Sequence, residues 1–314
     1  MNLIEKIREQ QMEKILSLKS VKKGWVLREK FLTTKMDDFT KKKMISLSDY
    51  LGECFRITAP APTPTSSSII PTSSRAVSNI LNSGSGDIWE SIVTWYLNIC
   101  LYGTNAVAVR GGEFCPKPIK DSISILHDSS VLHSEPDVMI ISSKELNDLE
   151  EDKSWAKSLK KINEVVEKEF KKVCVINIQV KTNWNENAQY GMLWNMLYKQ
   201  ARDKHFAPNG FRIGINTFTI SNLAHFGFAW MTVPTNKTVY TPSRLEVLRV
   251  KGLMSKNYWG KPTKANVAFS LSGIFDEFTR SPYYPNVNTV GELASEILGG
   301  KKTDLVFKRI FGLK

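Results

Sequence analysis

The sequence has few of the residues from which zinc sites and disulfide scaffolds are built. Its 314 residues include 4 cysteines and 4 histidines, with no Cys-x-x-Cys or His-x-x-x-His pair. The usual spacings of zinc ligands are therefore missing, and we interpret the cysteines as buried, reduced thiols. His133-Ser134-Glu135 resembles half of the zinc-deaminase signature, but the Pro-Cys-x-x-Cys half that would follow it is absent.

Long hydrophobic runs are missing as well. The longest, such as residues 226–233, are far shorter than the roughly 20 apolar residues that a membrane-spanning helix needs. The first ten residues carry charges every few positions and lack the apolar centre of a secretory signal, so we expect a cytoplasmic protein. The absence of a Gly-x-x-x-x-Gly-Lys-Ser/Thr loop disfavours an ATP-driven translocase.

Positive charge, in contrast, is in excess. Lysine and arginine total 43 against 31 acidic residues, a formal net charge of +12. The excess is local: residues 51–194 carry 14 basic and 17 acidic side chains, whereas residues 195–314 carry 17 and 7. A local basic surface is expected of a protein that holds a nucleic-acid backbone, although a solvated lysine-rich face has the same composition.

The hydrophobic pattern alternates between strand and helix periods. The predicted strands cover residues 106–110, 123–126, 137–141, 173–181, 212–220 and 226–233, and the predicted helices cover residues 1–23, 87–101, 151–171 and 187–204. The first helix is amphipathic and either packs internally or dimerises. Residues 59–74 contain four prolines among serines and threonines, which predicts a linker or extended arm. The alternation predicts an α/β fold with a central mixed β-sheet flanked by helices.

Polar residues of a particular kind mark the ends of two predicted strands. Asp137 follows Pro136 at the start of one strand, Gln179 and Lys181 end the next strong strand, and Glu90 lies on the preceding helix. The pleat places Gln179 and Lys181 on one face, beside Asp137 if the strands are neighbours. Because lysine is rarely buried without a partner, we expect a carboxylate next to Lys181.

This pattern resembles the PD-(D/E)-x-K nuclease superfamily, which includes most type II restriction endonucleases. The match is Pro136-Asp137 followed, after about forty residues, by Gln179-Val180-Lys181. Gln179 stands where the family usually has an acidic residue and is similar to the variant in Mrr-like restriction nucleases. The resemblance covers about residues 86–200 and implies a restriction-endonuclease-like fold. The predicted organisation is a helical arm with a linker at 1–75 and a nuclease domain at 76–314, with a catalytic core at about 86–233 and a basic, DNA-contacting part at 234–314.

The resemblance implies a Mg²⁺-dependent, site-specific endonuclease that cleaves double-stranded DNA. Asp137, the Gln179 amide oxygen and the Val180 backbone carbonyl would bind Mg²⁺, and Glu90 would restore the missing negative charge. Lys181 would orient the attacking water and neutralise charge on the phosphate. Cutting both strands with one site per chain implies a homodimer. The alternatives are a repair or other nuclease of the same fold and a non-catalytic DNA-binding module.

Each of these side chains also has a purely structural interpretation. Asp137 after a proline is a common turn residue at the start of a strand. Lys181 can extend its ammonium group to solvent from the strand end. Gln179 can satisfy a backbone group, and Glu90 stands at the third position of a capping box that begins at Asp87.

Two segments carry residue types that suit DNA contacts. After the motif, Asn183 and Asn185 can recognise adenine and the basic residues of the following helix can hold phosphates, whereas Asn187 is better explained as a helix cap. In residues 234–264, basic side chains are interleaved with Tyr240, Tyr258 and Trp259. The candidate basic contacts are Lys199, Arg202, Lys204, Lys237, Arg244, Lys256, Lys261 and Lys264. For each of them, a solvated lysine or arginine is the alternative.

Overall fold

The computed structural model describes a mixed α/β core built from separated parts of the chain. The described residues are 3–17, 90–98 except 92 and 96, 101, 104–111, 115–133, 136–146, 154–181, 183–184, 211–232, 240–254 and 257–260. The predicted linker at 59–74 and the predicted helix at 187–204 lie outside them. None of the helices in the described part is long and apolar enough to span a bilayer.

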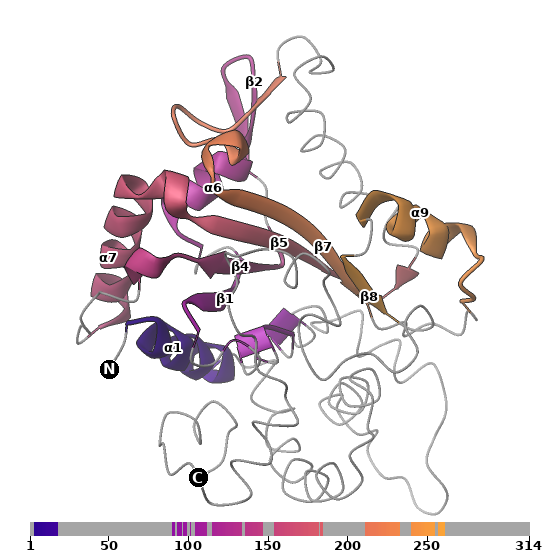
Figure 1. The fold of residues 1–314 in the computed structure, drawn as a ribbon, viewed down its shortest axis with the longest axis horizontal. Helices are drawn as coiled ribbons and strands as arrows, with labels where there is room; N and C mark the ends of the chain where they lie inside the picture. Colours follow the sequence, from indigo (N-terminus) through magenta and orange to yellow (C-terminus); the bar gives the residue numbers. More distant parts are fainter. Residues whose placement is uncertain are drawn as a thin grey trace, which may run out of the picture.

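The central sheet has five strands in the order β1-β4-β5-β7-β8 (Figure 1). The strands are β1 (Ala106–Arg110), β4 (Val138–Ser142), β5 (Cys174–Lys181), β7 (His225–Thr232) and β8 (Tyr258–Gly260). β1, β4 and β5 are antiparallel to their neighbours, whereas β7 and β8 continue the sheet in parallel from β5. The predicted mixed α/β sheet is therefore confirmed.

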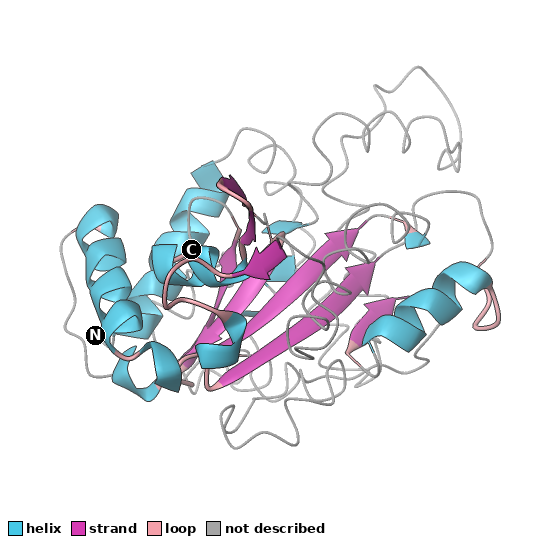
Figure 2. Cartoon of the chain, turned by 90° about the horizontal axis from the view of Figure 1, so that it is seen from above, coloured by secondary structure: helices cyan, strands magenta, loops and turns pink. Residues whose placement is uncertain are grey.

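Four helices and the helical residues between 90 and 98 surround this sheet. The helices are α1 (Leu3–Ser17), α6 (Lys117–Ile123), α7 (Trp155–Lys168) and α9 (Leu245–Met254), and three short 3-10 helices are η2 (Lys144–Leu146), η3 (Phe170–Lys172) and η5 (Ile220–Asn222). α1 contacts both β1 and α7, and α9 lies at the other side of the sheet, against β7 and β8 (Figures 1 and 2). Leu3, Ile4 and Ile7 are buried, so α1 packs internally.

The main hydrophobic core lies between α7 and one face of the sheet. Val175 of β5 joins Ile162 and Val166 of α7 in a single buried cluster. Because side chains alternate along a strand, the other residues of β5 on this face are Asn177, Gln179 and Lys181. We call this side of the sheet the α7 face. Polar residues thus follow the apolar core along the same line of β5.

A smaller sheet packs beside the central one. It has the order β3-β2-β6, with β2 (Ile125–His127), β3 (Ser130–Leu132) and β6 (Phe211–Ile213). The predicted strand over 212–220 is wrong beyond Ile213. Gly214 has φ of 100° and Asn216 has φ of 54°, and these left-handed conformations turn the chain back on itself through the Ile215–Phe218 bridge.

Two of the four cysteines fall within the described residues, and both are buried and free, as predicted. Burial raises the pKa of the Cys174 thiol to about 12, so this thiol is neutral at physiological pH. Burial likewise raises the pKa of Cys115. Neither side chain has the thiolate character of a nucleophile.

Candidate functional site

The carboxylate of Asp137 and the ammonium group of Lys181 meet at one end of the central sheet. Lys181 ends β5, Asp137 directly precedes β4, and Lys181 Nζ lies 2.8 Å from Asp137 Oδ2. The side chains are 14% and 25% exposed, respectively, so the ion pair lies at the rim of the core. The carboxylate partner that the sequence predicted for Lys181 is therefore Asp137.

Asp137 is held by the backbone of β5 as well as by Lys181. The Val180 N–H donates a hydrogen bond of 2.8 Å to Asp137 Oδ2. Because β4 begins only at Val138, the carboxylate takes the place of a backbone acceptor just beyond the paired residues. Both contacts use Oδ2, and Oδ1 has no hydrogen-bond partner among the described residues. One carboxylate oxygen of a fixed side chain thus remains for a ligand.

The backbone carbonyl of Val180 lies on the same side of β5 as its N–H group. In a strand, the N–H and C=O of one residue point toward the same neighbour. Since this N–H contacts Asp137, the carbonyl also faces the β4 side of the strand, at Asp137. Gln179, which is only 6% exposed, precedes Val180 and shares the α7 face with Lys181. The sheet therefore gathers Asp137, Gln179, Val180 and Lys181 at one end.

Three buried polar residues adjoin this group, and the sequence did not identify them as part of the site. Asn177 precedes Gln179 on the α7 face, and in the parallel register Trp230 pairs with Gln179 and Thr232 with Lys181. Asn177 Oδ1 and Nδ2, Trp230 Nε1 and Thr232 Oγ1 are buried without a hydrogen-bond partner. We call Asn177, Trp230 and Thr232 the buried polar file. The signal that could have revealed it is the two-residue spacing of Asn177, Gln179 and Lys181 in an otherwise apolar strand.

Glu90 lies elsewhere in this arrangement. Its carboxylate Oε2 is 3.0 Å from Nε of Arg110, the last residue of β1. Arg110 pairs in register with Val138, so the pleat places its side chain on the opposite face of the sheet from Asp137. The structure therefore brings Glu90 to Arg110 and not into the ion pair of Asp137 with Lys181. Asp87, the first residue of the predicted capping box, lies outside the described residues.

Few of the predicted DNA contacts fall within the described residues. Asn183 is partly buried directly after β5. Arg244 is exposed, pairs with Glu246 at 3.2 Å and stacks over the Tyr240 ring at 5.5 Å. The residues outside the described part are Asn185, Lys199, Arg202, Lys204, Lys237, Lys256, Lys261 and Lys264.

α9 adds basic residues that the sequence did not single out as contacts. Arg249 and Lys251 are exposed on this helix, together with Arg244 just before it. The helix packs against β7 and β8, the strands that run parallel to β5. Parallel strands end at the same edge of a sheet, so α9 flanks the part of the sheet that contains Lys181.

Comparison with known proteins adds no relative. No protein-family model and no curated protein matches this sequence. Among the described residues, moreover, histidine, cysteine, aspartate and glutamate nowhere gather in groups of three or more that could hold a metal ion. The chemistry of the site therefore has to be argued from one carboxylate, one amide, one backbone carbonyl and one lysine.

Proposed function

We propose that this protein is a Mg²⁺-dependent DNA endonuclease of the type II restriction class. The observation that supports the proposal is the contact of Asp137 with both Lys181 and the Val180 N–H at the ends of two adjacent strands. A carboxylate and an ammonium group fixed side by side in a partly exposed position can bind a cation and a phosphate together. The sequence motif and the local geometry agree on the same residues.

The residues present fit a magnesium ion that keeps most of its waters. The oxygens that would hold the ion are Asp137 Oδ1, the Val180 carbonyl and the Gln179 amide oxygen. Magnesium in proteins commonly takes one or two carboxylates and retains several waters, so a single aspartate is within its usual range. When bound, such an ion stabilises negative charge on a phosphate and lowers the pKa of coordinated water.

Lys181 would serve the phosphate and the attacking water. Its ammonium group is anchored by Asp137 but a quarter of the side chain is exposed, so it can donate to a ligand at the rim. A fixed cation at this point favours the deprotonated form of a nearby water and neutralises charge that develops on the phosphate. Asp137 would thus both contribute a metal ligand and keep Lys181 in place.

The basic surface supports DNA as the substrate. Residues 195–314 carry 17 basic and 7 acidic side chains, and the described part of that segment exposes Arg244, Arg249 and Lys251 at α9. A surface of this kind attracts the phosphate backbone and releases its counterions. Because each chain would have one site, cutting both strands calls for a homodimer.

A non-catalytic DNA-binding module is the second candidate, and one observation favours it. Glu90 pairs with Arg110, so Asp137 is the one acidic side chain that the described residues bring to Lys181. In this alternative, Asp137 and Lys181 only close the end of the sheet, and the protein binds DNA without cutting it.

Plasmid cleavage separates the two candidates. Supercoiled DNA is incubated with the purified protein in Mg²⁺ or in EDTA, and the ends of any product are sequenced. Asp137→Asn keeps an oxygen for the Val180 N–H, and Lys181→Met keeps the bulk of the side chain. Both should reduce cleavage by about 100-fold or more while DNA binding persists.

Matched controls alter exposed residues away from the sheet end. Asp128→Asn is one, because Asp128 is exposed in the β2–β3 turn and its φ of 51° suits asparagine. Lys160→Met, on the exposed side of α7, is the other. Wild-type cleavage by the Asp137→Asn and Lys181→Met variants would overturn the site. Tight DNA binding without cleavage by the wild-type protein would favour the binding module.

A further inference from the structure

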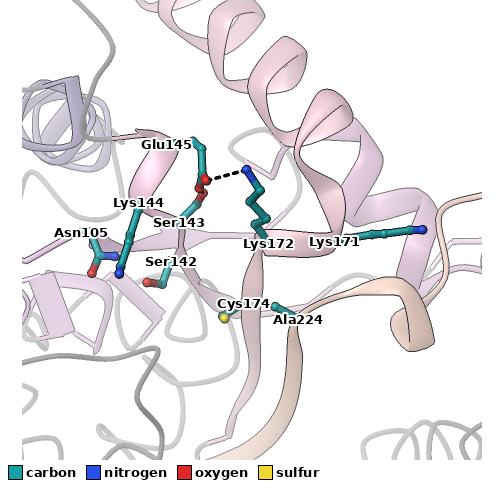
Figure 3. Close-up of a pocket in the computed structure, with 9 residues that line it drawn as sticks. All are labelled: Asn105, Ser142, Ser143, Lys144, Glu145, Lys171, Lys172, Cys174 and Ala224. Atoms are coloured by element: carbon teal, nitrogen blue, oxygen red, sulfur yellow. Dashed lines mark hydrogen bonds and ion pairs between the residues drawn. The ribbon is translucent and has the colours of Figure 1, made fainter.

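A pocket of about 390 Å³ lies at the end of the central sheet opposite to Asp137 and Lys181 (Figure 3). Ser142 ends β4, Cys174 begins β5, and Ala224 directly precedes β7. The lining residues are Asn105, Ser142, Ser143, Lys144, Glu145, Lys171, Lys172, Cys174 and Ala224. Since β5 rises about 3.3 Å per residue between the two ends, the pocket is roughly 20 Å from Lys181 and forms a separate site.

The inner wall of the pocket contains an unsatisfied acceptor. Asn105 is 7% exposed, and its side-chain oxygen Oδ1 has no hydrogen-bond partner. The backbone around it is satisfied, because the Ser143 N–H donates to the Asn105 backbone carbonyl at 3.3 Å. A buried acceptor without a donor is costly and rare in folded proteins. A ligand that enters this pocket should therefore bring a hydroxyl or amino donor to Asn105.

The outer part of the pocket is positively charged. Its lining has three lysines and one glutamate, a net charge of +2. Lys172 is already paired with Glu145 at 3.1 Å and with Glu169 at 2.8 Å. Among the described residues neither Lys144 nor Lys171 forms an ion pair.

The two lysines without an ion pair differ in direction. In Figure 3 the ammonium group of Lys144 lies close to Asn105, whereas the side chain of Lys171 extends away from the other lining residues. Lys171 is exposed on a flexible four-carbon stem, so its ammonium group can swing toward an anion at the mouth. The pocket thus offers one cation beside the unsatisfied acceptor and a second that can reach it.

We propose that this pocket binds a small organic phosphate that carries hydroxyl groups. The phosphate, with a charge close to −2 at neutral pH, matches the lining charge and is held by Lys144 and Lys171. A hydroxyl of the same molecule donates to Asn105 Oδ1. The volume falls within the range of small-molecule sites. This inference does not depend on the nuclease proposal, because the two sites share no residue.

Calorimetric titration of the full chain tests the proposal, with ribose 5-phosphate, ribose and inorganic phosphate as probes. Ribose 5-phosphate should bind most tightly, because it alone has both the dianion and the donors. Lys144→Ala/Lys171→Ala should weaken its binding by about tenfold or more. The control pair Lys157→Ala/Lys160→Ala removes the same charge from the exposed side of α7 and should change nothing.

Asn105→Leu separates recognition of the donor from recognition of the charge. This variant should bind ribose 5-phosphate no better than inorganic phosphate. Should it fail to fold in thermal unfolding, the lysine variant still decides, since both lysines are exposed. No binding of ribose 5-phosphate by the wild-type protein, or equal binding by the lysine variant, would overturn the proposal. Tighter binding of a short DNA duplex, lost in the same variant, would overturn it too and assign the lysines to DNA.

Discussion

Two regions of the central sheet treat buried polar groups in opposite ways. Along the free edge of β1, side chains satisfy the backbone: Arg8 Nη2 donates to the Ala106 carbonyl at 3.0 Å, and Asn98 both donates to the Ala108 carbonyl at 2.8 Å and accepts from the Ala108 N–H at 3.0 Å. The Arg110 N–H donates to Gln11 Oε1 at 3.4 Å. This edge is closed by α1 and by the helical residues between 90 and 98.

At the ends of β5 and β7, in contrast, polar side chains are buried without partners. Asn177, Trp230 and Thr232 together leave four buried donor or acceptor atoms unpaired, within one or two strand positions of Gln179 and Lys181. Folding alone would favour apolar residues here. The comparison teaches that polarity at the β1 edge serves stability, whereas polarity at the other region is what a site for water, metal or phosphate retains at the expense of stability.

The largest expected effect comes from removing Arg8 at the β1 edge. Its guanidinium group is fully buried, pairs with Glu5 at 3.0 Å and donates to backbone of β1. Arg8→Met leaves a carboxylate and a carbonyl without their donor, so the free energy of unfolding should fall by about 3 kcal/mol. Urea denaturation measures this. Lys160→Met, at an exposed site on α7, should change it by less than about 0.5 kcal/mol, and an equally small effect of Arg8→Met would show that α1 contributes little to the core.

Asn98→Leu should have the next largest effect. The substitution preserves bulk but leaves both the N–H and the carbonyl of Ala108 without their partner inside the protein. We expect a loss of about 2 kcal/mol in the same denaturation experiment. A neutral result would mean that water replaces the amide at this edge.

The same substitution in the other region should have the opposite sign. Asn177 is buried and neither atom of its amide has a partner, so Asn177→Leu removes an unsatisfied group and should raise the free energy of unfolding by about 1 kcal/mol. Thr232→Val should act in the same direction. If the buried polar file serves the site, both variants should also lose cleavage activity despite their greater stability. A destabilised Asn177→Leu protein would show that the amide has a structural partner, such as an ordered water, and would break the comparison.

These effects also mark what sequence could and could not predict. The strands that carry Asp137, Lys181 and Trp230 were predicted within one or two residues, because each is a local run of apolar, mostly β-branched or aromatic residues. The approach of Asp137 to Lys181 followed from the cost of burying an unpaired lysine. Local pattern thus predicts the core strands and the centre of the candidate site.

The rest depends on contacts between distant segments. Arg8 and Asn98 reach the β1 edge across gaps of 98 and 10 residues, and no periodicity shows which strand is an edge. The pairing of Glu90 with Arg110 likewise requires the register of β1, which places Arg110 on the face away from Asp137. The strand predicted at 123–126 begins only at Ile125, because Pro116 and Pro118 start α6, which runs to Ile123.

The smallest expected effect concerns pH and the pocket at the opposite end of the sheet. The Ser143 hydroxyl donates to Glu145 at 2.7 Å, and this hydrogen bond, with a smaller contribution from Lys172, holds the pKa of Glu145 below its ordinary value of 4.5. A lowered pKa in the folded state stabilises the protein fully above that ordinary value, and the contribution is lost as pH falls through the lower folded value. Glu145→Gln should therefore cost a few tenths of a kcal/mol at pH 7, since the group is partly exposed, and nothing once the wild-type carboxylate is protonated. Urea midpoints of the two proteins, measured from pH 7 down to about pH 3, should converge in acid. A constant difference across that range would mean that Glu145 contributes through packing and not through its charge.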